Sequence, residues 1–231
     1  METALITGAN RGIGLEFVRH FLDQKKRVFA CCRDLDTATD LTAMANDNDL
    51  ISLHELDVTD QSQIDGLAKD LSSQSLDYLI NNAGVYGERK VELGSIERKN
   101  FLEVMEVNCL GTLKVSEAFL EQVGRSNKKI VATISSQMGS ITDNNSGGAY
   151  AYRASKAALN AVMRSFALDA ESYGIHVLTL HPGWVKTDMG GRHAFVSTRQ
   201  SVAGMVEQIE KYGTKDQGEV FRRFDGKTIM W

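Results

Sequence analysis

A tyrosine and a lysine four residues apart are the residues in this chain whose types and spacing best suit proton chemistry. Tyr152 and Lys156 belong to a stretch whose apolar residues recur at helical spacing, so the two side chains share one helix face. A free tyrosine has a pKa of about 10, and a nearby ammonium group favours the phenolate and lowers that value. The pair could then act as a general acid or base near neutral pH. The alternative is a chance spacing, because the same pair occurs in many helices.

A glycine-rich turn follows the short apolar run at residues 4–7 and precedes a second helical pattern. Its glycines, Gly8, Gly12 and Gly14, permit a tight turn and a close approach of the backbone to a ligand. The free N–H groups and the dipole at the start of a helix favour a phosphate. The spacing Gly-x-x-x-Gly-x-Gly differs from the Gly-x-Gly-x-x-Gly dinucleotide fingerprint, so the strand before the turn and the helix after it carry the prediction of phosphate binding.

The end of the next predicted strand, residues 27–32, bears on the choice of dinucleotide. A carboxylate at this place binds the free 2′-hydroxyl of NAD(H), whereas an arginine accommodates the 2′-phosphate of NADP(H). Arg33 comes directly after the strand, and Arg11 in the glycine turn could join it. We therefore predict NADP(H). NAD(H) is the alternative, since Asp34 and Asp36 are close by, and Arg33 could also be an ordinary exposed loop residue.

Strands and helices alternate along the whole chain. Further strands are expected at residues 50–56, 76–80, 129–134, 175–180 and 218–231, the last with a turn at 225–226; helices are expected at about 60–71, 97–123, 152–173 and 198–212. The alternation predicts an α/β fold, a Rossmann-type doubly wound parallel sheet in three α/β/α layers, forming a single domain over residues 1–231. Ligands of such sheets bind outside the carboxyl ends of the strands. The candidate groups that fall there are Gly8, Arg33, Asp57, Asn82, Ser136 and Pro182.

Composition excludes several other classes of protein. The 231 residues are 42% hydrophobic and 24% charged, with a net charge of -4 and no long basic run, which argues against nucleic acid as a partner. No apolar run approaches membrane-spanning length, and no secretory signal is expected at the amino end. Three cysteines without metal or disulfide spacing favour a reducing cytoplasm, and the five scattered histidines predict no metal site.

Two of the predicted helices are apolar on more than one face. The helix at 97–123 and the helix that carries Tyr152 would be covered by the sheet and by a second subunit, which predicts a homodimer or homotetramer. A monomer is the alternative, because closely packed layers in one subunit could cover the same surface. Asn108 lies inside the first of these helices, and its amide must find partners there, either structural ones or in the site.

The chain resembles the short-chain dehydrogenase/reductase family in six stretches that occur in the family's order. They are residues 7–14, 81–84, 107–111, 134–136, the Tyr152–Lys156 pair, and Pro182-Gly183-x-Val185-x-Thr187. Within the family, residues 181–191 and the terminal tail resemble the C-factor and sniffer-type carbonyl reductase branch.

The resemblance implies a role for each candidate residue. Tyr152 would be the acid/base, and Lys156 would lower its pKa and bind the nicotinamide ribose. Ser136 would hold the substrate carbonyl, with Ser135 as the fallback, and Asn108 would support a water-linked proton relay. The implied cofactor contacts are Gly8, Asn10, Arg11, Gly12, Ile13, Gly14, Arg33, Asp57, Val58, Asn82, Ala83, Gly84, Tyr152, Lys156, Pro182, Gly183, Val185 and Thr187.

The implied activity is NADPH-dependent reduction of an aldehyde, ketone or quinone to an alcohol, or the reverse. Two alternatives are a dinucleotide-binding regulatory protein with little turnover and an isomerase, epimerase or dehydratase on the same fold. Residues 189–198 are where the family places its substrate lid. That segment is short here, which predicts an open site, with Gly190 and Gly191 as the hinge.

Overall fold

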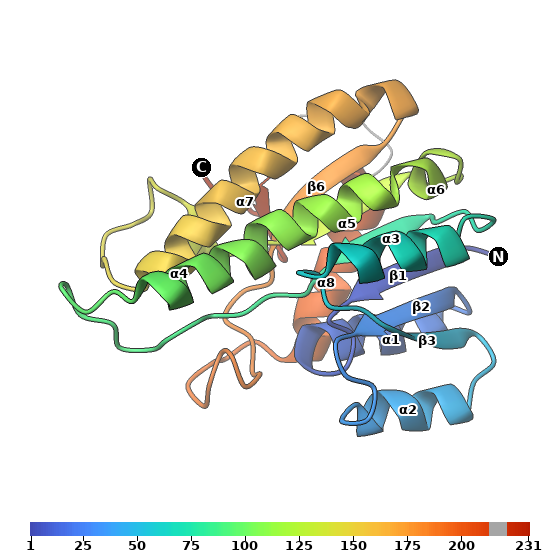
Figure 1. The fold of residues 1–231 in the computed structure, drawn as a ribbon, viewed down its shortest axis with the longest axis horizontal. Coiled ribbons are helices and arrows are strands. Elements are labelled where there is room, and N and C mark those ends of the chain that lie inside the picture. The colour runs from blue at the N-terminus through green and yellow to red at the C-terminus, as the bar shows by residue number, and fades with distance from the viewer. Residues whose placement is uncertain (213–220) are drawn as a thin grey trace.

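A seven-stranded sheet in the order β3-β2-β1-β4-β5-β6-β7 forms the centre of the computed structural model, which describes residues 1–212 and 221–231 (Figure 1). The strands are β1 (Thr3–Thr7), β2 (Arg27–Cys32), β3 (Ile51–Glu55), β4 (Tyr78–Asn81), β5 (Ile130–Ile134), β6 (His176–His181) and β7 (Phe221–Arg223). All six neighbouring pairs are parallel. The strand order reverses between β1 and β4, and such a reversal creates the crevice in which doubly wound sheets bind ligands. The predicted Rossmann-type fold is confirmed.

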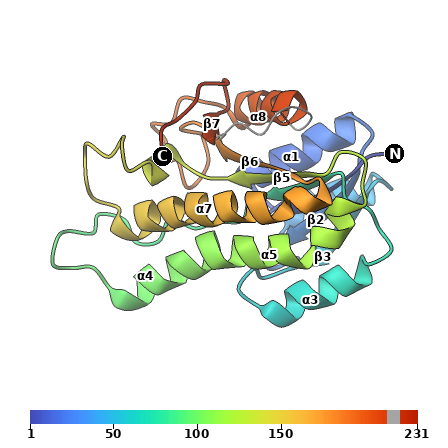
Figure 2. The ribbon, with the colours of Figure 1, turned by 90° about the horizontal axis from the view of Figure 1, so that it is seen from above.

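Helices cover both faces of this sheet (Figure 2). They are α1 (Gly12–Asp23), α2 (Thr39–Asn46), α3 (Gln61–Asp70), α4 (Arg98–Met105), α5 (Thr112–Ala118), α6 (Leu120–Gly124), α7 (Tyr150–Asp169) and α8 (Thr198–Tyr212). Successive strand residues point to opposite faces, so Ile6 packs in the core under α1 and α8 while Leu5 packs in the core under α3, α5 and α7. Both faces of the sheet are therefore largely apolar, which explains why a strand such as β5 is buried at every position and does not alternate between polar and apolar residues.

The helix predicted at 97–123 is not one α-helix, and this prediction was wrong. A π-helical turn, η1 (Glu106–Gly111), separates α4 from α5, and a second break at Phe119 separates α5 from α6. The π turn inserts an extra residue where the helix passes the end of β3. There a Cβ on Gly111 would lie 2.6 Å from the carbonyl oxygen of Val58, so the close approach needs glycine.

Other element ends also differ from the prediction. Helix α2 was missed, because its only buried residue is Leu41 and no apolar stripe marks it. Helix α7 starts two residues before Tyr152, and its last turn, η3 (Ala170–Tyr173), is a 3₁₀ helix. The strand in the predicted last element covers only Phe221–Arg223; the turn predicted at 225–226 is present, with Gly226 at a φ of +85°, and Ile229 donates back to Phe221. Residues 218–220 of that prediction lie outside the described residues.

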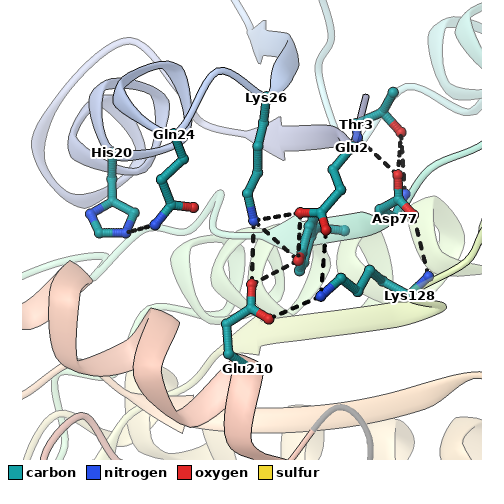
Figure 3. A network of polar contacts seen from close by, with 9 residues as sticks. Glu2, Thr3, His20, Gln24, Lys26, Asp77, Lys128 and Glu210 are labelled. Carbon is teal, nitrogen blue, oxygen red and sulfur yellow. Dashed lines mark hydrogen bonds and ion pairs between the residues drawn. The ribbon is translucent and has the colours of Figure 1, made fainter.

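A cluster of charges closes the amino edge of the sheet, opposite the candidate site (Figure 3). Nζ of Lys26 lies 2.8 Å from Glu2 and 3.3 Å from Glu210, and Nζ of Lys128 lies 3.4 and 3.2 Å from the same two carboxylates. The Tyr78 hydroxyl donates to Glu210 and Glu2 at 2.7 and 3.0 Å. Burial alone would raise the pKa of both carboxyls, but these hydrogen bonds and charges outweigh it and hold each pKa below 4.5.

Replacing the buried cation of this cluster is expected to destabilise the fold. Lys26→Met should lower the free energy of unfolding at pH 7 by about 2 kcal/mol, because two partly buried carboxylates lose the more buried of their two cations. The folded pKa values of Glu2 and Glu210 are depressed, so their stabilising effect is complete above 4.5 and is lost as the pH falls through the folded values. The difference between wild type and variant should therefore shrink in acid.

Denaturant titrations between pH 3 and 7 measure this effect. Lys99→Met is the matched control, because Lys99 pairs with Glu103 at 3.8 Å on an exposed helix face. Such a pair contributes at most about 0.5 kcal/mol, so this variant should stay close to wild type. Equal losses in the two variants, or a loss for Lys26→Met that does not change with pH, would show that the cluster does not act through these charges.

Candidate active site

Tyr152 and Lys156 share one face of α7, and that face is packed closely on the turn η2 (Gln137–Gly139) after β5. A Cβ on Gly139 would lie 2.8 Å from the carbonyl carbon of Lys156, so only glycine allows this approach. Lys156 is buried, and its Nζ donates to the carbonyl of Ile134 at 2.9 Å. Burial lowers the pKa of Lys156 to about 8, and the neighbouring Cys109 opposes that shift. At neutral pH the side chain is thus a cation that loses its proton readily.

The two serines that follow β5 have different partners. Ser135 donates to Oδ1 of Asn160 at 2.6 Å, so its hydroxyl is engaged within the core. Ser136 accepts a hydrogen bond from the N–H of Met138 at 3.1 Å and is hydrogen-bonded to Tyr152. The structure places Ser136, and not the fallback Ser135, beside the phenol.

Tyr152 is nearly buried, with 8% of its surface exposed, and its pKa is raised rather than lowered. Burial raises the pKa to about 12, the Ser136 hydrogen bond opposes this, and the phenol of Tyr86 adds to it. Nζ of Lys156 lies 5.9 Å from the centre of the Tyr152 ring. The depression by Lys156 that the resemblance implied is not found in this arrangement: burial is the largest cause of the shift in the Tyr152 pKa, and Lys156 is not among its causes.

Asn108 is fully buried in η1 and uses its whole amide group. Its Nδ2 donates to the carbonyl of Val85 at 2.8 Å and to Ser155 at 3.0 Å, and its Oδ1 accepts from the N–H of Val85 at 2.8 Å. A Cβ on Gly84 would lie 3.1 Å from Oδ1 of Asn108 and 3.6 Å from Nζ of Lys156. The amide therefore braces the segment after β4 and also lies near Lys156.

The glycine turn after β1 is held by the segment after β4. Gly8 has a φ of +63°, and a Cβ on Gly14 would lie 2.1 Å from the Gly8 carbonyl oxygen, so both positions require glycine. Nδ2 of Asn82 donates to the carbonyls of Thr7 and Gly8 at 2.9 and 3.0 Å. The Thr7 hydroxyl accepts the N–H groups of Asn82 and Ala83, both at 3.0 Å. Asn82, predicted as a cofactor contact, shapes the turn itself.

The amino end of α1 suits an anion. Arg11 occupies its N-cap position without a side-chain cap, whereas Asp60 caps α3 by accepting two backbone N–H groups. The first N–H groups of a helix have no partner within it, so those of Gly12, Ile13 and Gly14 point to the carboxyl edge of the sheet as donors. With the close backbone approach of the turn, this donor set fits the pyrophosphate of a dinucleotide. Asn10 lies in the same turn.

Arg11 and Arg33, which were expected to act together at the end of β2, have different surroundings. Arg11 pairs with Asp188 at 2.7 Å, and both side chains are exposed. Arg33 is exposed directly after β2. The carboxylate of Asp34 accepts two N–H groups of its own turn, at 3.0 and 3.3 Å. Both bonds end on Oδ1 of Asp34, and the side chains of Arg33 and Asp34 are both exposed at the end of β2.

Asp57 and Val58 follow β3 at the same edge. Oδ1 of Asp57 accepts the N–H and the hydroxyl of Thr59, at 2.9 and 2.7 Å. Val58 is buried against Gly111 of η1. Both residues border the edge as predicted, with part of the Asp57 carboxylate used to shape its own turn.

Pro182 and Gly183 follow β6 and are fixed from behind. The Pro182 carbonyl accepts from the Ser201 hydroxyl at 2.6 Å. Gly183 has a φ of +85°, and a Cβ there would lie 2.8 Å from the ring of Phe224, so the position requires glycine. These contacts with α8 and with the turn after β7 fix the positions of Pro182 and Gly183, which form the wall against which the next segment packs.

The predicted lid segment is folded back on the chain before it. Val185 is buried and bridges Val196, and the Thr187 side chain lies 3.2 Å from where a Cβ on Gly12 would stand. A Cβ on Gly190 would lie 1.9 Å from the Val185 carbonyl oxygen. Gly190, predicted as half of a hinge, is thus a packing glycine in this arrangement.

A pocket beside Tyr152 contains residues that the sequence did not single out. Its apolar and aromatic lining includes Tyr86, Val91, Ile96, Phe101 and Tyr150. Tyr86 stacks on Tyr152, and Arg89 lies over Tyr86. The only sequence signal for Tyr86 was its position two residues after the 81–84 stretch.

Residues 1–212 and 221–231 contain neither a cluster of metal-binding side chains nor a helix suited to cross a membrane. No group of three or more His, Cys, Asp or Glu side chains within these residues could hold a metal ion. No helix there combines the length and apolarity needed to cross a membrane. The three cysteines are free and buried.

A doubly wound parallel sheet with an uncapped glycine turn at the start of α1, and a Tyr–Lys pair at the same edge, defines a Rossmann-type dinucleotide-binding protein. The family model described as short chain dehydrogenase matches residues 2–194. A 1-hydroxy-2-glutathionyl-2-methyl-3-butene dehydrogenase of Rhodococcus sp. (strain AD45) is 34% identical, with all of both chains covered. The C-signal protein of Myxococcus xanthus is 39% identical over 71% of this chain and 98% of its own.

Solved structures of similar proteins agree with this family match. The carbonyl reductase Sniffer of D. melanogaster superposes with a TM-score of 0.93 at 32% identity over 100% of both chains. An NADPH-bound carbonyl reductase from chicken fatty liver gives 0.90 at 34% identity, covering 100% of this chain and 99% of that one. The chain belongs to the short-chain dehydrogenase/reductase family, as its motifs predicted.

Proposed function

We propose that this short-chain dehydrogenase/reductase is an NADP(H)-dependent carbonyl reductase that converts an aldehyde, ketone or quinone to an alcohol. The observation that carries the proposal is the hydrogen-bonded pair of Tyr152 and Ser136 beside buried Lys156, at the edge where α1 presents its N–H groups. The likeness to carbonyl reductases, one of them NADPH-bound, supports both the reaction and the cofactor.

The raised pKa of Tyr152 suits an acid. A phenol with a pKa of about 12 keeps its proton at neutral pH and releases it when negative charge develops on the carbonyl oxygen. Ser136 is the second donor to that oxygen. NADPH, when bound, supplies the hydride; the residues of the chain orient the two reactants and deliver the proton. Lys156, whose pKa is about 8, is mostly protonated at neutral pH and would bind the nicotinamide ribose.

Cofactor choice rests on the end of β2. Arg33 is exposed there, while the Asp34 carboxylate is engaged by its own turn. This arrangement favours a 2′-phosphate over a free 2′-hydroxyl. The wall formed by Pro182, Gly183 and Val185 would lie on the nicotinamide side.

Arg33→Ala should weaken NADPH binding by about tenfold to a hundredfold and leave NADH binding nearly unchanged, because only the 2′-phosphate loses a charged hydrogen bond. Fluorescence titration of wild type and variant with each cofactor measures this. Arg98→Ala, at an exposed position that begins α4, is the control. Tighter binding of NADH than of NADPH by the wild type would transfer the role to Asp34.

The reaction itself is tested by following NADPH oxidation with a panel of aldehydes, ketones and quinones. One alcohol formed per NADPH consumed is expected. Products without cofactor consumption would indicate an isomerase, epimerase or dehydratase, and cofactor binding with no turnover would favour a regulatory protein.

The proposed homodimer or homotetramer is supported by exposed leucines on neighbouring helices. Leu102 of α4, Leu110 of η1 and Leu168 of α7 are each about half exposed. These helices lie next to one another along one side of the molecule (Figures 1 and 2). The cytoplasmic location stays a prediction.

A further inference from the structure

The aromatic ring of Tyr86 lies against Tyr152. The two ring centres are 4.7 Å apart and the ring planes are inclined by 29°, which is a stacked arrangement. Since Tyr152 is only 8% exposed, Tyr86 is part of what covers it. The two rings also line the same pocket, whose other walls include the apolar residues Ile96 and Phe101 and the polar residues Glu88, Glu97 and Asn100.

Tyr86 is held in this position from its other side. The guanidinium carbon of Arg89 lies 4.9 Å from the centre of the Tyr86 ring. Arg89 also donates to the carbonyl of Met189 at 2.6 Å and to that of Asp188 at 3.4 Å. The guanidinium thus links Tyr86 to the segment after β6, at residues about a hundred positions away in the sequence.

That segment is itself tied to the glycine turn. Asp188 pairs with Arg11 at 2.7 Å, and Thr187 packs on Gly12. A continuous line of contacts therefore runs from the start of α1 through residues 187–189 and Arg89 to the ring that covers Tyr152.

We propose that Tyr86 is a specificity-determining residue: its ring limits the size of the group that can stand beside the reacting carbonyl, and Arg89 is the positioning residue that keeps the ring there. A carbonyl with small substituents reaches the Tyr152 and Ser136 hydroxyls past the ring. A branched substituent needs the space that the ring fills, between these hydroxyls and the pocket. This inference rests on the proposed carbonyl reductase function.

The first test compares propanal with a tert-butyl ketone as substrates. Tyr86→Ala should raise the ratio of kcat/KM for the ketone to that for propanal by about tenfold or more, since removing a side chain from a pocket typically has effects of this size. Most of the change should appear in KM for the ketone. Tyr86→Phe keeps the ring and should keep the wild-type ratio. Arg89→Gln should shift the ratio in the same direction by less, and Arg98→Gln should leave it unchanged.

A second measurement does not depend on turnover. Nitration of Tyr152 by tetranitromethane, located by mass spectrometry, reports its exposure. Nitration should rise several-fold in Tyr86→Ala and also rise in Arg89→Gln, which changes an exposed residue and should fold normally. Failure of the wild type to reduce any carbonyl would refute the proposed function, and nitration would still decide whether Tyr86 covers Tyr152. Unchanged nitration in these variants, or an unchanged substrate ratio in active Tyr86→Ala, overturns the proposal.

Discussion

Tyr152→Phe is expected to lower kcat for carbonyl reduction by about a thousandfold and to leave NADPH binding nearly intact, because general acid catalysis contributes effects of this order. Phenylalanine keeps the ring that stacks on Tyr86 and removes only the hydroxyl that is bonded to Ser136. The carbonyl oxygen then loses its proton donor while the surrounding packing is kept.

Steady-state kinetics with NADPH and a reactive aldehyde, together with fluorescence titration of the cofactor, give both quantities. Tyr173→Phe removes a hydroxyl from an exposed tyrosine beyond the end of α7 and should behave as wild type. A Tyr152→Phe variant that kept most of its kcat would show that another group supplies the proton. Loss of NADPH binding together with kcat would assign Tyr152 a mainly structural role.

Much of the fold could be predicted because a buried parallel sheet has a simple signature. Residues 130–134 of β5, for example, are buried at every position and apolar at all but Thr133, since one set of side chains faces α1 and α8 and the other faces α5 and α7. The periodicity of the sequence does not predict the local structure where tertiary contacts determine it. The π turn at Asn108 exists because the amide must reach Val85 and Gly111 must pass Val58, and neither contact leaves a periodic trace.

The site was predictable to the extent that its residues follow strands. Asn82 and Pro182 come directly after a strand, Ser136 is the second residue after one, and parallel strands end at one edge. The covering ring of Tyr86 and its Arg89 anchor were missed. Their partners, Tyr152 and Met189, are distant in the sequence, and no spacing rule connects them.

The direction of the shift in the Tyr152 pKa could also not be predicted from the sequence. The spacing of Tyr152 and Lys156 shows that a cation is near, but the shift depends on how far each group is removed from water. Burial under Tyr86 and the turning of Lys156 toward Ile134 reverse the expected direction. This reversal keeps the phenol protonated at neutral pH, which is the state that the proposed proton donor requires.

Gly14→Ala is expected to reduce NADPH affinity by a large factor and to destabilise the protein by about 1–3 kcal/mol, the usual cost of forcing extra atoms into a packed site. The added methyl group would lie 2.1 Å from the Gly8 carbonyl oxygen and 2.6 Å from Nδ2 of Asn82. Relief requires the glycine turn to move away from α1. That movement breaks the bonds from Asn82 that shape the turn, and the N–H donors at the start of α1 lose their alignment with the pyrophosphate.

Gly66→Ala provides the matched control, because a Cβ at this exposed position in α3 would meet nothing within 4 Å. The same change there should stabilise the protein by about 0.5–1 kcal/mol, the ordinary preference of a helix interior for alanine. Denaturant unfolding and cofactor titration of both variants test this. If contact geometry determines the effect, Gly14→Ala lowers the free energy of unfolding and Gly66→Ala raises it. Normal NADPH binding by Gly14→Ala would mean that the turn does not hold the pyrophosphate, and the phosphate site would have to lie elsewhere along the sheet edge.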